Sequence, residues 1–72
     1  MKKNYRLQDL DCAHCAQKIE DSIKKLDGVR MVRVNFLSQR LTLEADDDHF
    51  SEILEEAVKI FRKIEPDCKV IR

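Results

Sequence analysis

The 72-residue sequence predicts an α+β fold of the ferredoxin-like βαββαβ type, in which two helices pack on one face of a four-stranded antiparallel sheet. The spacing of apolar residues switches between the periods of a strand and of a helix, in the order strand, helix, strand, strand, helix, strand. The one Gly and the one Pro each fall where an element should end. The length suffices for one domain, so residues 1–72 are expected to form a single unit.

The first half of the chain predicts a strand, a helix and a second strand. Residues 5–10 alternate apolar and polar side chains, as a half-buried strand does. Residues 14–26 follow a helical period, and the apolar side chains that share one face are Ala16, Ile19, Ile23 and Leu26. Gly28 can adopt the left-handed conformation that ends a helix, and residues 29–36 alternate again as a strand.

The second half predicts a hairpin partner, a helix and a last strand. Residues 40–45 alternate and lie close enough to the preceding strand to form a hairpin with it. The acidic run at residues 46–48 is expected to cap the next helix, because carboxylates accept hydrogen bonds from free helix N–H groups. Helical spacing indicates that helix at Phe50, Ile53, Leu54, Ala57, Val58, Phe61 and Ile64. Pro66 cannot continue it, and residues 68–71 complete the sheet as a short strand.

The charge balance and the absence of long apolar runs narrow the classes of partner. Fourteen basic residues face 14 acidic ones, so no basic excess points to nucleic acid or anionic lipid. No apolar run approaches the roughly 20 residues of a membrane-spanning helix, and the first residues do not resemble a signal peptide. We therefore expect a cytoplasmic chain or the cytosol-facing part of a transporter, with no direct membrane insertion of its own.

Cys12 and Cys15 carry the clearest chemistry. They are separated by two residues where the first strand gives way to the first helix, and at this spacing both sulfurs can turn toward one point. Free N–H groups at a helix N-terminus lower the pKa of a thiol, and thiolates are soft ligands that select Cu(I), Zn(II) and Cd(II). The three cysteines are an odd number, which argues against a closed disulfide framework. The directions of the predicted strands bring Cys68 to the same edge of the sheet.

Residues 10–20, Leu-Asp-Cys-Ala-His-Cys-Ala-Gln-Lys-Ile-Glu, resemble the metal loop and first helix of the heavy-metal-associated domain. The likeness covers essentially the whole chain and continues through residues 26–29, 32–36 and 41–43. That family includes copper chaperones and the N-terminal domains of metal-transporting P-type ATPases. The resemblance implies the fold predicted above and implies that Cys12 and Cys15 are the metal ligands.

Asp11 is the informative departure from the copper-type loop, which carries Gly-Met-Thr before the first Cys. Here Asp9, Leu10 and Asp11 occupy those places, and Leu10 can replace Met as an apolar plug. An Asp directly before the first Cys resembles the zinc-, cadmium- and lead-exporting ATPases, and a carboxylate suits a divalent ion as a third ligand. Zn(II), Cd(II) or Pb(II) is therefore favoured over Cu(I) or Ag(I), which two thiolates satisfy. The alternative role for Asp11 is to cap the first helix.

Cys68 is the remaining candidate ligand. Its thiol is either a third sulfur ligand or a small buried apolar group, as free Cys often is. Glu65 and Asp67 are weaker candidates from the loop before the last strand. Imidazole is a good zinc ligand, but His14 is expected to face solvent and His49 to lie far from the metal edge.

These residues predict a metal-binding domain that delivers metal to, or regulates, a metal-exporting P-type ATPase, either as its cytosolic N-terminal domain or as a separate protein. The expected partners are the metal ion and the membrane or cytosolic domains of such a transporter. The chain itself is not expected to be an enzyme, because it contains no phosphate-binding loop or phosphorylation motif. A thiol–disulfide redox module is the less favoured alternative. We expect a monomer, or a dimer linked through shared metal.

Overall fold

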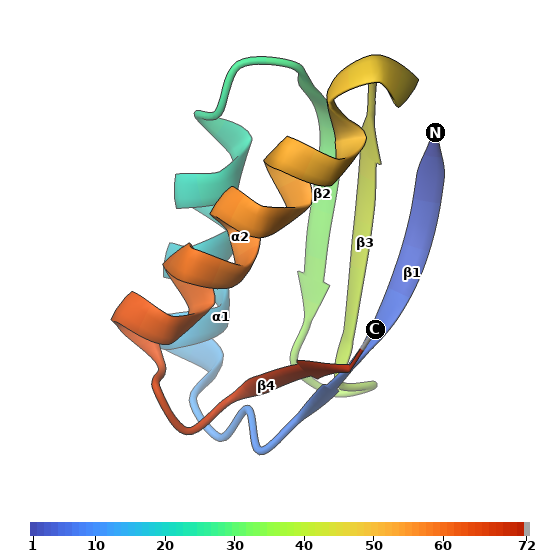
Figure 1. Ribbon diagram of the computed structural model, residues 1–72. Coiled ribbons are helices and arrows are strands. Elements are labelled where there is room, and N and C mark those ends of the chain that lie inside the picture. Colours follow the sequence, from blue (N-terminus) through green and yellow to red (C-terminus); the bar gives the residue numbers. More distant parts are fainter. Residues whose placement is uncertain (72) are drawn as a thin grey trace.

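Two helices lie on one face of a four-stranded antiparallel sheet in the computed structural model, which describes residues 1–71 (Figure 1). The strands are ordered β2-β3-β1-β4 across the sheet. This architecture confirms the predicted ferredoxin-like fold. Along the chain the elements are β1 (Lys2–Gln8), α1 (Ala13–Lys24), β2 (Val29–Asn35), β3 (Arg40–Ala45), the 3₁₀ helix η1 (Asp47–His49), α2 (Phe50–Ile64) and β4 (Lys69–Ile71).

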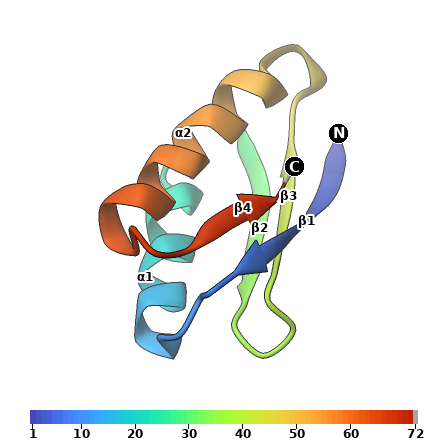
Figure 2. The same cartoon turned by 60° about the horizontal axis from the view of Figure 1, so that its bottom comes forward.

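Three loops meet at one end of the molecule because of how β1 is paired. Its antiparallel pairing with β3 ends where Arg6 faces Arg40. Its pairing with β4 runs only from Arg6 opposite Ile71 to Gln8 opposite Lys69. The β1–α1 loop, the β2–β3 turn and the α2–β4 loop therefore lie together at the end away from the N-terminus (Figures 1 and 2). This confirms the placement predicted from the strand directions.

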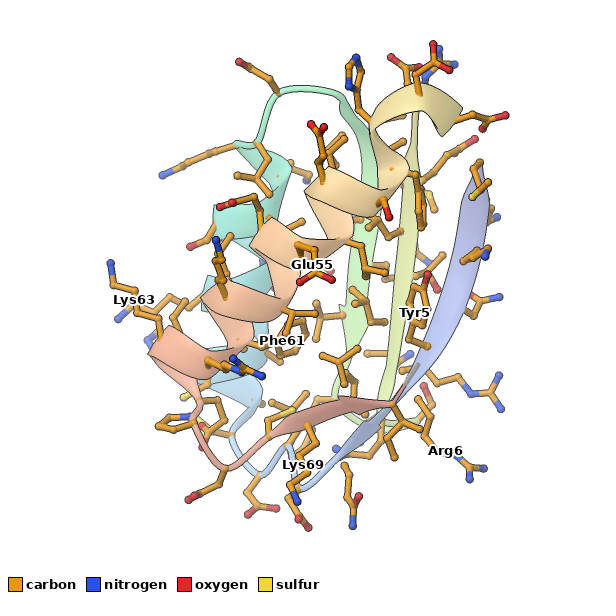
Figure 3. The ribbon with its side chains drawn as sticks, in the orientation of Figure 1. Tyr5, Arg6, Glu55, Phe61, Lys63 and Lys69 are labelled. Atoms are coloured by element: carbon orange, nitrogen blue, oxygen red, sulfur yellow. The ribbon has the colours of Figure 1, made fainter. Side chains whose placement is uncertain are left out.

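The core lies between the helices and the inner face of the sheet. Figure 3 shows Phe61 on the side of α2 that faces the sheet, where it is 1% exposed, and Lys63 pointing away from it. Both helices bury the apolar face that their spacing predicts. The buried residues are Leu7, Leu10, Ala16, Ile19, Ile23, Val32, Leu41, Leu43, Ala45, Phe50, Ile53, Leu54, Ala57, Phe61 and Cys68.

The first strand differs from its prediction at both ends. It begins at Lys2, because the backbone of its polar first residues pairs with β3 and needs no apolar side chain to do so. It ends at Gln8, because Asp9 takes a left-handed conformation with φ of 63°. Leu10 therefore belongs to the loop, and its burial comes from the turn of the chain rather than from a strand pattern.

The acidic run at residues 46–48 does not cap a helix, which corrects the role predicted for it. Neither η1 nor α2 begins with a capping hydrogen bond from a side chain. The carboxylate of Asp46 instead lies 2.7 Å from the guanidinium of Arg30. The N-terminal ammonium group lies 2.7 Å from the carboxylate of Asp47, and hydrogen bonding from that group lowers the pKa of Asp47. Ion pairs with Arg30 on β2 and with the N-terminal ammonium group therefore hold this acidic run in place.

Gly28 lies in the turn between α1 and β2 with φ of 91°. It does not end the helix as predicted, because α1 already ends at Lys24 with Lys25 as its C-cap. A Cβ at this position would lie 2.9 Å from Cδ1 of Ile53 on α2. The turn therefore needs a glycine both for its backbone conformation and for its close approach to the second helix.

Candidate metal centre

The loop of residues 9–12 carries the chain from β1 to α1 and holds the first candidate thiol. The left-handed Asp9 turns the backbone out of the sheet, and the side chain of Leu10, 2% exposed, enters the core. Leu10 is thus the apolar plug that its position predicts. The next two residues lie above the buried Leu10, where Asp11 is exposed and Cys12 is half-buried.

Cys12 is the residue that caps α1. Its backbone is extended, with φ of −125° and ψ of 113°, and its Sγ accepts a hydrogen bond from the backbone N–H of Cys15 at 3.2 Å. Its carbonyl oxygen accepts the first helical hydrogen bond, from the N–H of Ala16 at 3.0 Å. This arrangement corrects the alternative in which Asp11 caps the helix. The cap brings the sulfur of Cys12 to the first turn of α1, beside Cys15.

The pKa values of the two thiols are shifted in opposite directions. Hydrogen bonding from the side chain of Cys15, together with the backbone N–H of the same residue, lowers the pKa of Cys12 below its ordinary 9.0. Donating to Cys12 raises the pKa of Cys15 to about 12, and partial burial and the nearby carboxylate of Glu65 add to that rise. Cys12 therefore loses its proton more readily than Cys15, whose proton a bound cation would have to displace.

Cys68 lies behind the loop, at the start of the chain into β4. It is 4% exposed, and its N–H donates to the carbonyl oxygen of Glu65 at 3.0 Å. Burial raises the pKa of Cys68 to about 11, and the carboxylates of Glu65, Asp9 and Asp11 also raise it. In this arrangement Cys68 behaves as a small buried apolar group, and the negative charges of the nearby carboxylates favour its protonated form.

The structure brings Cys12 and Cys15 together but does not gather a larger ligand set. Within residues 1–71, no three side chains of His, Cys, Asp or Glu are arranged as a metal-binding group. Asp11 is exposed in the loop and Cys68 is buried behind it. Either would have to turn toward the two thiols to bind the same ion, so both stay predictions.

The two histidines lie where the sequence predicts. His14 is exposed on the first turn of α1. His49 lies at the start of α2, where its Nδ1 is 3.9 Å from a carboxylate oxygen of Glu52. The start of α2 is at the opposite end of that helix from the three loops (Figure 1).

Sequence reasoning missed Gln39, which contacts the loop from the β2–β3 turn. Its side-chain oxygen accepts a hydrogen bond from the N–H of Leu10 at 3.0 Å, and its side-chain N–H donates to the carbonyl oxygen of Leu10 at 2.7 Å. In the sequence, Gln39 is one polar residue of a predicted turn. A contact between residues 29 positions apart leaves no periodic signal.

The unequal pKa values predict the order in which the thiols react. In the metal-free protein at neutral pH, iodoacetamide should modify Cys12 first, because its thiolate fraction is the largest. Cys15, with a pKa raised to about 12, and the buried Cys68 should react later. Peptide mass spectrometry over time measures the order, and the three rates should converge in denaturant. Preferential labelling of Cys15 in the folded protein would contradict the predicted order of the two pKa values.

The sequence model of the heavy-metal-associated domain matches residues 4–67, which include both thiols of the loop. The chain belongs to the heavy-metal-associated domain family. Over 70 residues, 97% of this domain, it is 34% identical to the cadmium, zinc and cobalt-transporting ATPase of Bacillus subtilis (strain 168). The domain spans about a tenth of the length of that relative, since it covers 10% of it.

Solved structures share the fold of this heavy-metal-associated domain. A structure named CopZ metallochaperone superimposes with a TM-score of 0.76 at 17% identity, covering 99% of this chain and all of the other. The N-terminal domain of a potential copper-translocating P-type ATPase from Bacillus subtilis, in its Cu(I)-loaded state, superimposes with a TM-score of 0.72 at 26% identity. That match covers 97% of this chain and 82% of the other. The chain therefore shares its fold with a metallochaperone and with the N-terminal domain of a potential P-type ATPase.

The family to which the chain belongs is named for its association with heavy metals. Among residues 1–71, no helix is both long enough and apolar enough to cross a membrane.

Proposed function

We propose that this heavy-metal-associated domain binds a soft divalent ion, Zn(II), Cd(II) or Pb(II), on the thiolates of Cys12 and Cys15. The observation that carries the proposal is the pairing of these two sulfurs at the capped first turn of α1. One thiol of the pair, Cys12, has a lowered pKa. A cation that binds the two sulfurs can displace the proton of the other thiol. Thiolates are the ligands that soft cations prefer.

Asp11 and Cys68 are the proposed additional ligands. A divalent ion of this class takes about four ligands, and two thiolates leave positions open. Asp11 directly precedes the first thiol and offers carboxylate oxygens at the surface of the loop. Cys68 offers a third sulfur if its thiol turns out of the core and loses its proton. The open positions also suit transfer, because ligands from a partner can reach the ion before the first two release it.

The role that we propose is delivery of metal to, or regulation of, a metal-exporting P-type ATPase. Support comes from the 34% identity to a cadmium, zinc and cobalt-transporting ATPase along nearly the whole chain. In this proposal residues 1–72 act in the cytoplasm as one metal-binding unit, whose partners are the cytosolic or membrane domains of the transporter. The unit works as a monomer, and an ion with open positions can link two copies.

The second candidate is a carrier of Cu(I) or Ag(I). The observation that favours it is the 26% identity and shared fold with a domain solved in its Cu(I)-loaded state. Cu(I) needs only two thiolates, which this loop supplies without help from Asp11.

A competition titration of the reduced protein with Zn(II), Cd(II) and Cu(I), repeated on Asp11→Asn, distinguishes the two candidates. We expect the variant to lose at least about tenfold in Zn(II) and Cd(II) affinity, as an oxygen ligand is lost, and to keep its Cu(I) affinity. Asp9→Asn is the matched control, because it removes a carboxylate from the same loop and Asn tolerates the left-handed conformation found there. Dominant Cu(I) binding that ignores Asp11→Asn would support the copper carrier instead.

A further inference from the structure

Gln39 is held in an uncommon backbone conformation at the end of the β2–β3 turn. Its φ of 54° lies in the left-handed region, which side chains other than Gly and Asn seldom adopt. A left-handed backbone at a residue other than Gly costs free energy, which contacts elsewhere have to offset. The Gln39 side chain makes contacts of this kind.

The side chain of Gln39 makes three hydrogen bonds to backbone groups. Its Oε1 accepts from the N–H of Leu10 at 3.0 Å, and its Nε2 donates to the carbonyl oxygen of Leu10 at 2.7 Å. The same Nε2 donates to the carbonyl oxygen of Phe36 at 2.8 Å, at the other end of the turn. One amide thus satisfies both backbone groups of Leu10 and fixes itself to its own turn.

The backbone of Gln39 extends the pairing of β1 past the first residue of β3, Arg40. The regular ladder stops where Arg6 faces Arg40, and the N–H of Leu7 then donates to the carbonyl oxygen of Gln39 at 2.8 Å. The chain next leaves the sheet at Asp9, so no strand remains to bind the backbone of Leu10. The amide side chain takes the place of that missing strand partner.

Leu10 stands two residues before Cys12, so its position fixes the approach of the chain to the first thiol. Its side chain is 2% exposed in the core, and its backbone is bound on both sides by Gln39. On the other side of the loop, the capping hydrogen bond from Cys15 to Cys12 fixes the start of α1. Asp11 is the single residue between Leu10 and Cys12, the two residues that these hydrogen bonds hold.

We propose that Gln39 is a positioning residue of the metal centre, which clamps Leu10 and thereby holds the Cys12 segment in the geometry that receives the ion. This inference rests on the proposed function of Cys12 and Cys15. Because the clamp orders the loop before the ion arrives, less ordering remains to be done on binding, and the affinity is higher. Gln39 itself does not touch the ion in this account.

Two substitutions test the clamp. Gln39→Met keeps the length of the side chain and removes all three hydrogen bonds. Gln39→Asn keeps an amide and suits the left-handed backbone, but it is one methylene too short to reach Leu10. Ser38→Ala is the control on the same turn, because the exposed Ser38 contributes its backbone N–H, which alanine retains.

Hydrogen exchange of the metal-free proteins, followed by NMR, measures how strongly the hydrogen bond from Leu10 to Gln39 protects the Leu10 amide. The amide of Leu10 should exchange about five- to tenfold faster in Gln39→Met and Gln39→Asn than in wild type, as expected for the loss of one hydrogen bond. The amide of Leu43, inside β3, reports on the stability of the whole fold and should change less. Equal acceleration at Leu10 and Leu43 would show general destabilisation and would overturn the inference.

Competition titration with Zn(II) and Cd(II) then measures the effect of the clamp on metal affinity. Both variants should bind about tenfold more weakly than wild type and than Ser38→Ala, the loss typical of residues that position ligands. Unchanged affinity despite faster exchange at Leu10 would also overturn the positioning role. Failure of the wild type itself to bind either ion is a different result, because it overturns the proposed function of the thiols.

Discussion

Substituting Ser for Cys12 should lower the affinity for Zn(II) and Cd(II) by at least about a hundredfold, since each ligand carries a large share of the binding free energy. The hydroxyl of Ser does not ionise at neutral pH, so the variant loses the thiol whose pKa is lowered. It also loses the sulfur that caps α1, although a Ser oxygen can accept the same hydrogen bond from the N–H of Cys15. The fold should therefore survive while metal binding fails.

The double substitution Cys12→Ser, Cys15→Ser should leave no metal binding at micromolar concentrations of ion. Far-UV circular dichroism and the midpoint of urea unfolding serve as controls for folding. Both should stay near the wild-type values, because the buried core is assembled from apolar residues of the helices and the sheet. Tight 1:1 binding that persists in the double variant would place the metal at another site and refute the role of the loop.

Substituting Ala for Leu10 should lower the free energy of unfolding by about 2–5 kcal/mol, the range for Leu→Ala in a closed core. A domain of this length has a total stability of only about 4–10 kcal/mol. The side chain of Leu10 is 2% exposed and belongs to the main core cluster, although it lies on a loop. The loss should also weaken metal binding, because Leu10 anchors the chain that leads to Cys12.

Leu37 provides the matched control for that experiment. It lies on the β2–β3 turn at the same end of the molecule and is 90% exposed. Leu37→Ala should change the free energy of unfolding by no more than about 0.5 kcal/mol. Urea unfolding of both variants measures the difference. Equal midpoints for Leu10→Ala and Leu37→Ala would mean that the plug under the loop is not part of the core.

The elements with clear periodicity were predicted most accurately. The boundaries of β3 match the predicted strand at residues 40–45, where apolar and polar residues alternate without interruption. The core faces of α1 and α2 also match, because one amphipathic stripe can be buried in only one way. The start of β1 was missed because its pairing with β3 uses backbone groups, which are the same for every residue type.

The charged and polar residues were predicted less well. The acidic run at residues 46–48 has the composition of a helix cap, yet Asp46 and Asp47 pair with Arg30 and the N-terminal ammonium group. Asp11 is also a residue type that favours a helix cap, yet Cys12 caps α1. A polar side chain can satisfy its hydrogen bonds with several neighbours at similar free energy, so its choice depends on which groups the fold brings near.

The fold class, the apolar faces of the helices and strands, and the pair of thiols at a helix start could be predicted from the sequence, because each of them depends on the local spacing of residues. The lower pKa of Cys12 relative to Cys15, and the contact of Gln39 with the loop, are seen only in the folded structure. Both features involve contacts between segments far apart in the chain, such as Glu65 with Cys15 and Gln39 with Leu10. Such contacts follow from the packing of the whole domain and leave no period in the sequence.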